Sequence, residues 1–131
     1  MTHLPTVFVS HGAPTFALEP GLAGPQLSAL GRALPKPQAV LIVSPHWVTP
    51  SPRVGLAQQP ATIHDFGGFP QPLHEINYPA TSHPELARRA LALLQQAGWI
   101  AHGDDSRGLD SGAWVPLLYP YPDADVPVFQ V

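Results

Sequence analysis

Two short apolar runs constrain the fold of this chain more than any other feature of its sequence. The runs at residues 6–9 and 39–43 are rich in β-branched residues and contain no polar interruption except at their ends. Strands of this kind are buried on both faces, as in a parallel sheet that is covered by helices. We expect further strands at residues 99–102 and 126–131, where shorter apolar runs occur.

Helical patterns separate these expected strands. One helix is predicted over residues 25–34, and a stronger one over residues 84–97, where apolar residues recur at helical spacing. Ser82 and Glu85 have the spacing of a capping box, and Gly98 stands where a helix C-terminus favours a left-handed residue. The alternation predicts an α/β fold, namely a layered α/β/α arrangement around a mostly parallel central sheet.

Composition limits the class of protein. A chain of 131 residues that is 44% hydrophobic and 11% charged fits one folded domain, residues 1–131, and excludes a disordered chain. The net charge of -3, with no basic cluster longer than Arg88-Arg89, indicates neither nucleic-acid binding nor an anionic membrane surface. No apolar run approaches membrane-spanning length, so we expect a cytoplasmic protein.

The chain has two features that suggest specialised loops and an incomplete sheet. Residues 49–79 contain six prolines and no periodicity, and a loop of this length in a compact domain is usually functional. The final run, residues 126–131, is apolar to its last residue. We therefore expect a sheet that is incomplete at the C-terminus, and a chain that is the N-terminal portion of a larger catalytic domain.

Two histidines follow two expected strands in parallel contexts. His11 comes after Val9-Ser10, and His46 comes after the 39–43 run and Ser44-Pro45. Ligands bind in the crevice at the carboxyl ends of strands in open α/β sheets. Zero cysteines exclude thiolate sites, and two neutral imidazoles suit Fe(II) or Zn(II). The sequence thus predicts a metal site at His11 and His46; the alternative is that one is a loop histidine and the other a helix cap.

Two further clusters are candidates for functional loops. In residues 64–70, His64 and Asp65 precede two glycines and lie among phenylalanines, which allows a backbone approach to a ligand beside an aromatic wall. The segment 107–117 is expected to form a turn and a short helix.

Together these motifs resemble a known family. Ser-His-Gly-Ala-Pro at 10–14, Ser-Pro-His-Trp at 44–47, His-Asp-Phe-Gly-Gly-Phe-Pro at 64–70, Asn-Tyr-Pro-Ala at 77–80 and Arg-Gly-Leu-Asp at 107–110 are similar in order and spacing to the class III extradiol ring-opening dioxygenases of the LigB type, 4,5-DOPA dioxygenase branch. The resemblance implies a non-haem dioxygenase that opens a catechol such as DOPA with O2. Fe(II) is the expected metal, and Zn(II) fits the same site.

The resemblance also implies roles for individual residues. His11 and His46 are the first two metal ligands, and the loop around His64 and Asp65 borders the substrate and supplies catalytic groups. The third ligand and a further catalytic histidine belong to the C-terminal half of the family, which a second chain could supply. Ser111 stands where the family usually has histidine; serine keeps a hydrogen-bonding group at this catalytic position but does not titrate near neutral pH.

Two other functions compete with this interpretation. A metal-dependent hydrolase could use His11, His46 and Asp65 around Zn(II) and a bound hydroxide. A catalytically inactive fragment that binds a metal or a catechol is the second alternative, and Ser111 favours it.

Overall fold

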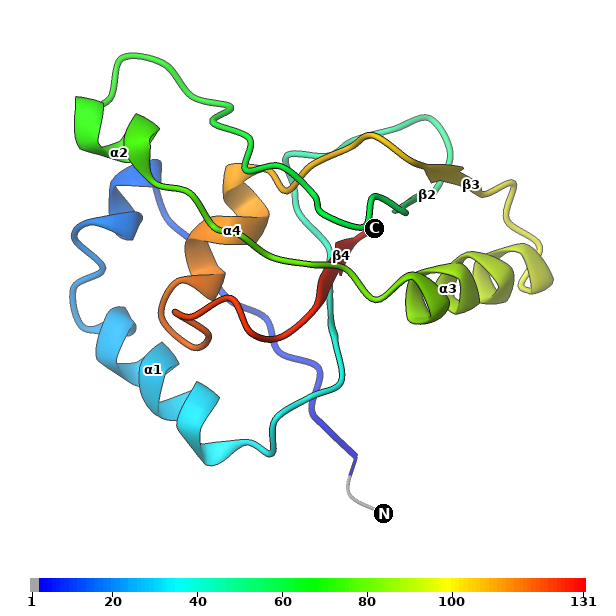
Figure 1. Ribbon diagram of the computed structural model, residues 1–131, viewed down its shortest axis with the longest axis horizontal. Helices are drawn as coiled ribbons and strands as arrows, with labels where there is room; N and C mark the ends of the chain where they lie inside the picture. The colour runs from blue at the N-terminus through cyan, green and yellow to red at the C-terminus, as the bar shows by residue number, and fades with distance from the viewer. Residues whose placement is uncertain (1–2) are drawn as a thin grey trace.

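The computed structural model describes residues 3–131 and contains short helices and strands that alternate along the chain (Figure 1). The elements, in order, are η1 (Pro14–Ala17), α1 (Ala23–Ala33), β1 (Val40–Ile42), β2 (Arg53–Gly55), α2 (Gln71–Glu75), α3 (Pro84–Gln96), β3 (His102–Asp104), α4 (Ser111–Leu117) and β4 (Val128–Gln130). The longest of these helices, α3, has 13 residues, and no helix of the described part has the length and apolarity to cross a bilayer.

All strand pairing is parallel among the described residues. β1 pairs with β4 in the register Val40 to Val128, and β2 pairs with β3 in the register Arg53 to His102. The two ladders lie side by side, because a Cβ on Gly55 of β2 would lie 3.4 Å from the Gln130 carbonyl oxygen of β4. This confirms the predicted α/β class, with the parallel strands divided between two ladders.

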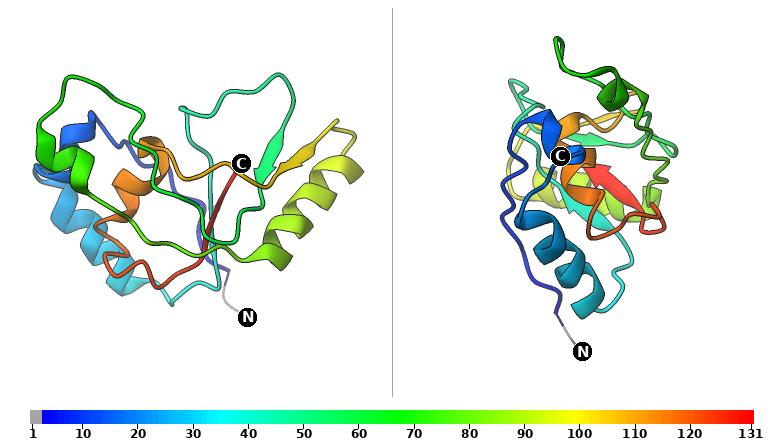
Figure 2. Two further views of the ribbon diagram at one scale, coloured as in Figure 1. Left: turned by 45° about the horizontal axis from the view of Figure 1, so that its top comes forward. Right: turned by 90° about the vertical axis from the view of Figure 1, so that its left-hand side faces the viewer.

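The layers follow from the alternation of side chains along β4. Val128 packs into a core cluster with Trp114 and other residues of α4. The next residue, Phe129, packs in a second cluster with Val54 of β2 and Ala87 of α3. Successive strand residues face opposite sides of a sheet, so β4 carries helices on both faces. The left view of Figure 2 shows the same division, with α1 and α4 on one side of β4 and α3 on the other.

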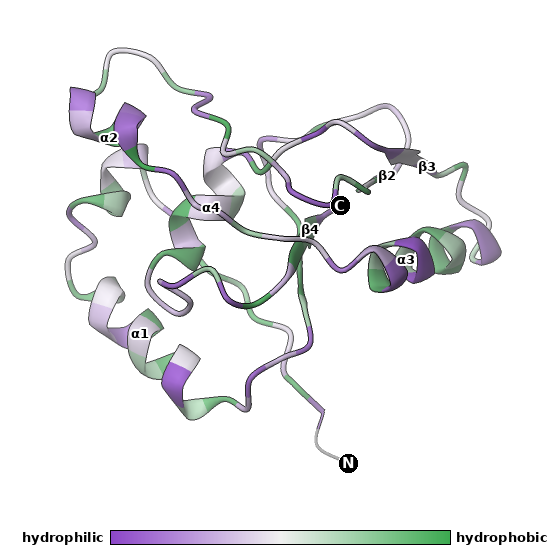
Figure 3. Cartoon of the chain, in the orientation of Figure 1, coloured by the Kyte–Doolittle hydropathy of each residue, from purple (hydrophilic) through white to green (hydrophobic). Residues whose placement is uncertain are grey.

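Both predicted helices form, and the cap of α3 differs from the prediction. Purple and green residues alternate along α3 in Figure 3, as its amphipathic pattern requires, and Gly98 follows it with a φ of 95°. The predicted capping box is wrong: the His83 ring accepts the Leu86 amide hydrogen, and the buried Ser82 Oγ has no hydrogen-bond partner. The imidazole of His83 replaces the serine hydroxyl because α3 begins at Pro84, as predicted, and this start makes His83, not Ser82, the N-cap residue.

The predicted strand at residues 6–9 does not form. This segment is extended but belongs to no ladder, and Phe8 is 97% exposed. A strand needs a hydrogen-bonded neighbour, and within residues 3–131 β1 pairs only with β4 and leaves its other edge free. The predicted strand at 99–102 is displaced to β3, while β2 and α2 lie inside the 49–79 stretch that has no periodicity.

Candidate functional site

The His11 and His46 rings lie together, as the sequence predicts. The centroids of the two imidazoles are 5.1 Å apart, and their planes meet at 87°. His46 stands in the turn after β1, where Pro45 prevents the strand from continuing, and His11 stands just before η1. The convergence is thus a property of the fold, while the role of the rings as metal ligands remains a prediction.

The hydrogen bonds of both rings leave the same nitrogen free. His11 Nδ1 lies 2.7 Å from the Gly12 carbonyl oxygen, and His46 Nδ1 lies 2.8 Å from Asp65 Oδ2. A carbonyl and a carboxylate only accept, so Nδ1 is the donor in each ring. A neutral imidazole that donates from Nδ1 keeps its lone pair on Nε2, which is the arrangement that metal-binding histidines commonly adopt.

Asp65 and Ser111 hold the His46 ring from one side. The Ser111 amide donates to Asp65 Oδ1 at 2.9 Å, and the Ser111 hydroxyl lies 3.1 Å from His46 Nδ1. Burial raises the pKa of Asp65, but the hydrogen bonds from Ser111 and His46 outweigh it, so the net pKa lies below its ordinary value. Asp65 is therefore a carboxylate at neutral pH, and two predicted site residues meet at His46.

His64 belongs to a different group of contacts. Its Nε2 donates to the Ile76 carbonyl oxygen at 2.7 Å, and its ring centroid lies 5.7 Å from that of Trp114 and 6.0 Å from that of Phe66. His74 adds a further ring, 5.0 Å from Phe66. Among the described residues, the aromatic contacts of His64 are with this cluster and not with His11 or His46. The predicted aromatic wall is present, and the adjacent residues His64 and Asp65 serve separate environments.

Asp110 is a residue of the site that the sequence did not single out. It is fully buried, and its ligand atoms lie within 4.8 Å of those of His46 and Asp65, so the three residues could hold a metal ion. However, Oδ1 already accepts from Ser44 Oγ and the Ala113 amide, and Oδ2 from Arg107 and Gln130. Four donors occupy the lone pairs that a metal would need. Two signals were available: Asp110 ends the Arg-Gly-Leu-Asp motif at 107–110, and it caps the helix in 107–117.

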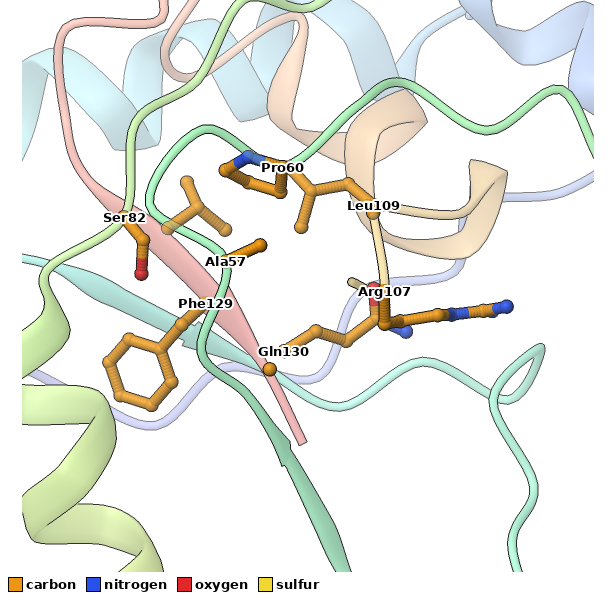
Figure 4. Close-up of a pocket in the computed structure, with 10 residues that line it drawn as sticks. Ala57, Pro60, Ser82, Arg107, Leu109, Phe129 and Gln130 are labelled. Atoms are coloured by element: carbon orange, nitrogen blue, oxygen red, sulfur yellow. The ribbon is translucent and has the colours of Figure 1, made fainter. Parts of the chain in front are cut away.

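A small hollow lies behind this network, between β2, β4 and the segment that leads to Asp110 (Figure 4). Arg107, Leu109 and Gln130 border it, with Pro60 and Ser82 from the loops before α3. Its volume is about 10 Å³, which corresponds to one water molecule and is too small for an aromatic ring. The hollow is therefore not a binding pocket for a substrate of that size.

Comparisons with known proteins agree with these motifs. The family described as the catalytic LigB subunit of aromatic ring-opening dioxygenase matches residues 1–131. The protein named 4,5-DOPA dioxygenase extradiol in Escherichia coli (strain K12) is 42% identical over 130 residues, which are 99% of this chain and 48% of that protein. The protein of the same name in Beta vulgaris is also 42% identical, over 96% of this chain and 48% of its own length.

A solved structure shares the fold. The crystal structure of an uncharacterized protein from Escherichia coli K12 superposes with a TM-score of 0.64 at 33% sequence identity, over 84% of this chain and 39% of that one. The chain thus spans about half the length of the curated relatives it matches.

Proposed function

Because the chain belongs to the LigB family of aromatic ring-opening dioxygenases, we propose that residues 1–131 form the N-terminal portion of the catalytic domain of an extradiol dioxygenase. The complete protein would open the ring of a catechol with O2, beside the two hydroxyl groups. DOPA is the proposed substrate, since the relatives in Escherichia coli and Beta vulgaris are named for it.

The observation that carries the proposal is that the two imidazole rings lie together and are both hydrogen-bonded through Nδ1. His11 and His46 converge, and each has its Nδ1 hydrogen engaged by an oxygen acceptor, which leaves both Nε2 lone pairs available. Imidazole nitrogen suits iron and zinc equally, so the donor set fits the metal that the family requires. We propose that these two residues hold Fe(II), and that further ligands come from a C-terminal half on the same polypeptide or on a second chain.

Bound Fe(II) would supply Lewis acidity toward the catechol hydroxyls and an electron source for O2, which Zn(II) in the same position lacks. The residues of this chain would prepare the site. Asp65 orients the His46 ring, and the Ser111 amide holds Asp65 in place.

His64 has a proposed role in proton transfer. Because its Nε2 donates to the Ile76 carbonyl, its Nδ1 keeps a lone pair that can take a proton from a substrate hydroxyl. The rings of Phe66 and Trp114 beside it provide an apolar border for an aromatic substrate.

The test is to remove each histidine in a protein that also carries the C-terminal half found in the relatives. We expect His11→Ala and His46→Ala to lose bound iron and O2 consumption with L-DOPA, since each removes one ligand. His102→Ala is the matched control, because His102 is exposed on β3 and should leave both unchanged. Iron content is measured by mass spectrometry of the purified proteins, and full iron retention in either ligand variant would refute the assignment.

A metal-dependent hydrolase is the second candidate, and the grouping of His46, Asp65 and Asp110 is the observation that favours it. The four donors on Asp110 oppose it, because they leave that carboxylate no free lone pair. The requirement for O2 separates the two functions: hydrolysis proceeds under anaerobic conditions and ring opening does not. Binding of L-DOPA without turnover would identify the inactive fragment.

A further inference from the structure

We propose that Asp110 is a positioning residue of the candidate metal site, which acts on His46 through the Ser44 hydroxyl. This inference rests on the proposed function, since it concerns the same histidine. It assigns to Asp110 a role other than metal binding, although its carboxylate lies close to His46 and Asp65.

A continuous chain of hydrogen bonds connects the two residues. The Ser44 hydroxyl donates to Asp110 Oδ1 at 2.6 Å, and the oxygen of the same hydroxyl accepts the His46 amide hydrogen at 3.1 Å. Ser44 is buried, at 3% exposure, so water does not compete for these bonds. The carboxylate thereby fixes the direction of the Ser44 hydroxyl, and the hydroxyl fixes the backbone turn that carries His46.

Asp110, at the other end of this series of hydrogen bonds, is bound to three other parts of the molecule. Asp110 caps α4 through the Ala113 amide at 3.2 Å, forms an ion pair with Arg107 at 2.9 Å, and accepts from Gln130 of β4 at 2.6 Å. In Figure 4 the Arg107 and Gln130 side chains lie next to each other at the end of β4. Because three further groups bind this buried carboxylate, its position relative to α4 and β4 is fixed.

The first turn of α4 packs in direct contact with the turn that carries His46. A Cβ added to Gly112 would collide with Ser44 Oγ, so a glycine is needed for α4 to come this close. The first turn of α4 therefore reaches His46 in two ways: Ser111 contacts the ring through its hydroxyl, and Asp110 holds the backbone through Ser44. The position of one metal ligand is set by a helix that supplies no ligand itself.

The decisive variant is Ser44→Ala, which removes the connection and leaves Asp110 its other three partners. We expect apparent Zn(II) affinity, with Zn(II) as a redox-inert probe, to fall about 10- to 100-fold, as happens when groups that orient metal ligands are lost. The protein is the one that carries the C-terminal half of the relatives, and calorimetric titration gives the affinity. Ser106→Ala is the matched control: its hydroxyl bonds to Asp104, away from His46, and the affinity should stay within about twofold of wild type.

Asp110→Asn separates positioning from stability. Asparagine keeps an oxygen for the Ser44 hydroxyl but turns an amide group toward the donors of Arg107 and Gln130. We expect Asp110→Asn to show the larger fall in melting temperature and the smaller fall in Zn(II) affinity, and Ser44→Ala to show the reverse. A purely structural role would make affinity follow melting temperature in both variants, and that result would overturn the proposal.

A second readout keeps this inference apart from the proposed function. Ring-nitrogen NMR of the metal-free protein reports the surroundings of the His46 ring, and its signals should shift in Ser44→Ala because the turn that carries His46 loses the bond to its amide. If wild type binds no Zn(II), the proposed function fails, and the NMR signals alone decide the positioning role. Identical His46 signals and identical Zn(II) affinity in wild type and Ser44→Ala would end it.

Discussion

At the scale of single residues, Asp65 controls the orientation of the His46 ring. Its carboxylate accepts from His46 Nδ1 at one oxygen and from the Ser111 amide at the other, so the ring has one preferred tautomer. Because hydrogen bonds hold the pKa of Asp65 below its ordinary value of 3.8, the group is charged throughout the neutral range. A charged acceptor fixes the orientation of the ring and makes Nε2 of His46 a better metal ligand.

Asp65→Asn tests this directly. We expect Zn(II) affinity to fall about 10- to 100-fold, since the amide is a weaker acceptor and can present its NH2 group to the ring. Asp123→Asn is the control, because Asp123 is exposed. Calorimetric titration of both variants against wild type gives the comparison, and equal affinities for all three would rule out the orienting role.

The same carboxylate predicts how stability changes in acid. The pKa of Asp65 is lower in the folded protein than in the unfolded chain, so the unfolded chain binds the proton more readily. The stabilisation is complete above the unfolded value of 3.8 and is lost as the pH falls through the lower folded value. Urea unfolding of metal-free protein across this acid range should show a steeper loss for wild type than for Asp65→Asn; parallel curves would contradict the expectation.

Individual residues also show how much of the candidate site could be predicted from the sequence. The convergence of His11 and His46 was predicted on the premise that each follows a strand of one sheet. The ring centroids do lie 5.1 Å apart, but only His46 follows a strand, because residues 6–9 join no ladder. The contact of Asp65 with His46 and the burial of Asp110 were not predictable, because both depend on how loops far apart in sequence pack together. A lone aspartate before a short helix has many roles, and only its four partners reveal this one.

At the scale of elements, α1 packs so closely that one of its glycines has no room for a side chain. A Cβ on Gly31 would collide with the Pro120 backbone, in the chain that follows α4. The elements that the sequence predicted well are those with long periodic patterns, α1 and α3. The short elements β2 and α2, with three and five residues, are defined by contacts with their neighbours, and their local sequence carries too little periodicity to predict them.

Gly31→Ala sets two effects against each other. Alanine favours a helix interior over glycine by about 1 kcal/mol. The collision is with backbone, which cannot rotate away, and overpacking of this kind costs about 1–3 kcal/mol. We expect net destabilisation, seen as a lower urea midpoint. Gly67→Ala is the control, since its Cβ would meet nothing within 4 Å; a stabilised Gly31→Ala would mean that α1 can shift outward.

At the scale of the whole molecule, β1 has a free edge on the side away from β4 within residues 3–131. β1 has a single partner within residues 3–131, and next to its free edge Leu41 and Val43 are 48% and 71% exposed. The sequence predicted a buried strand here, and the exposure of Leu41 shows that β1 is not buried on both faces. Phe8, from the segment expected to form a strand, is 97% exposed. Free strand edges and exposed apolar side chains favour association with other chains.

We therefore expect the isolated 131-residue chain to self-associate, with a mass that rises with concentration in size-exclusion chromatography coupled to light scattering. Val43→Lys should shift the distribution toward monomer, because a charge beside an open strand edge opposes pairing. Leu22→Lys is the matched control: Leu22 is 87% exposed but lies at the start of α1, away from any strand. A chain that is monomeric at every concentration, or that responds equally to both substitutions, would show that association does not proceed through the β1 edge.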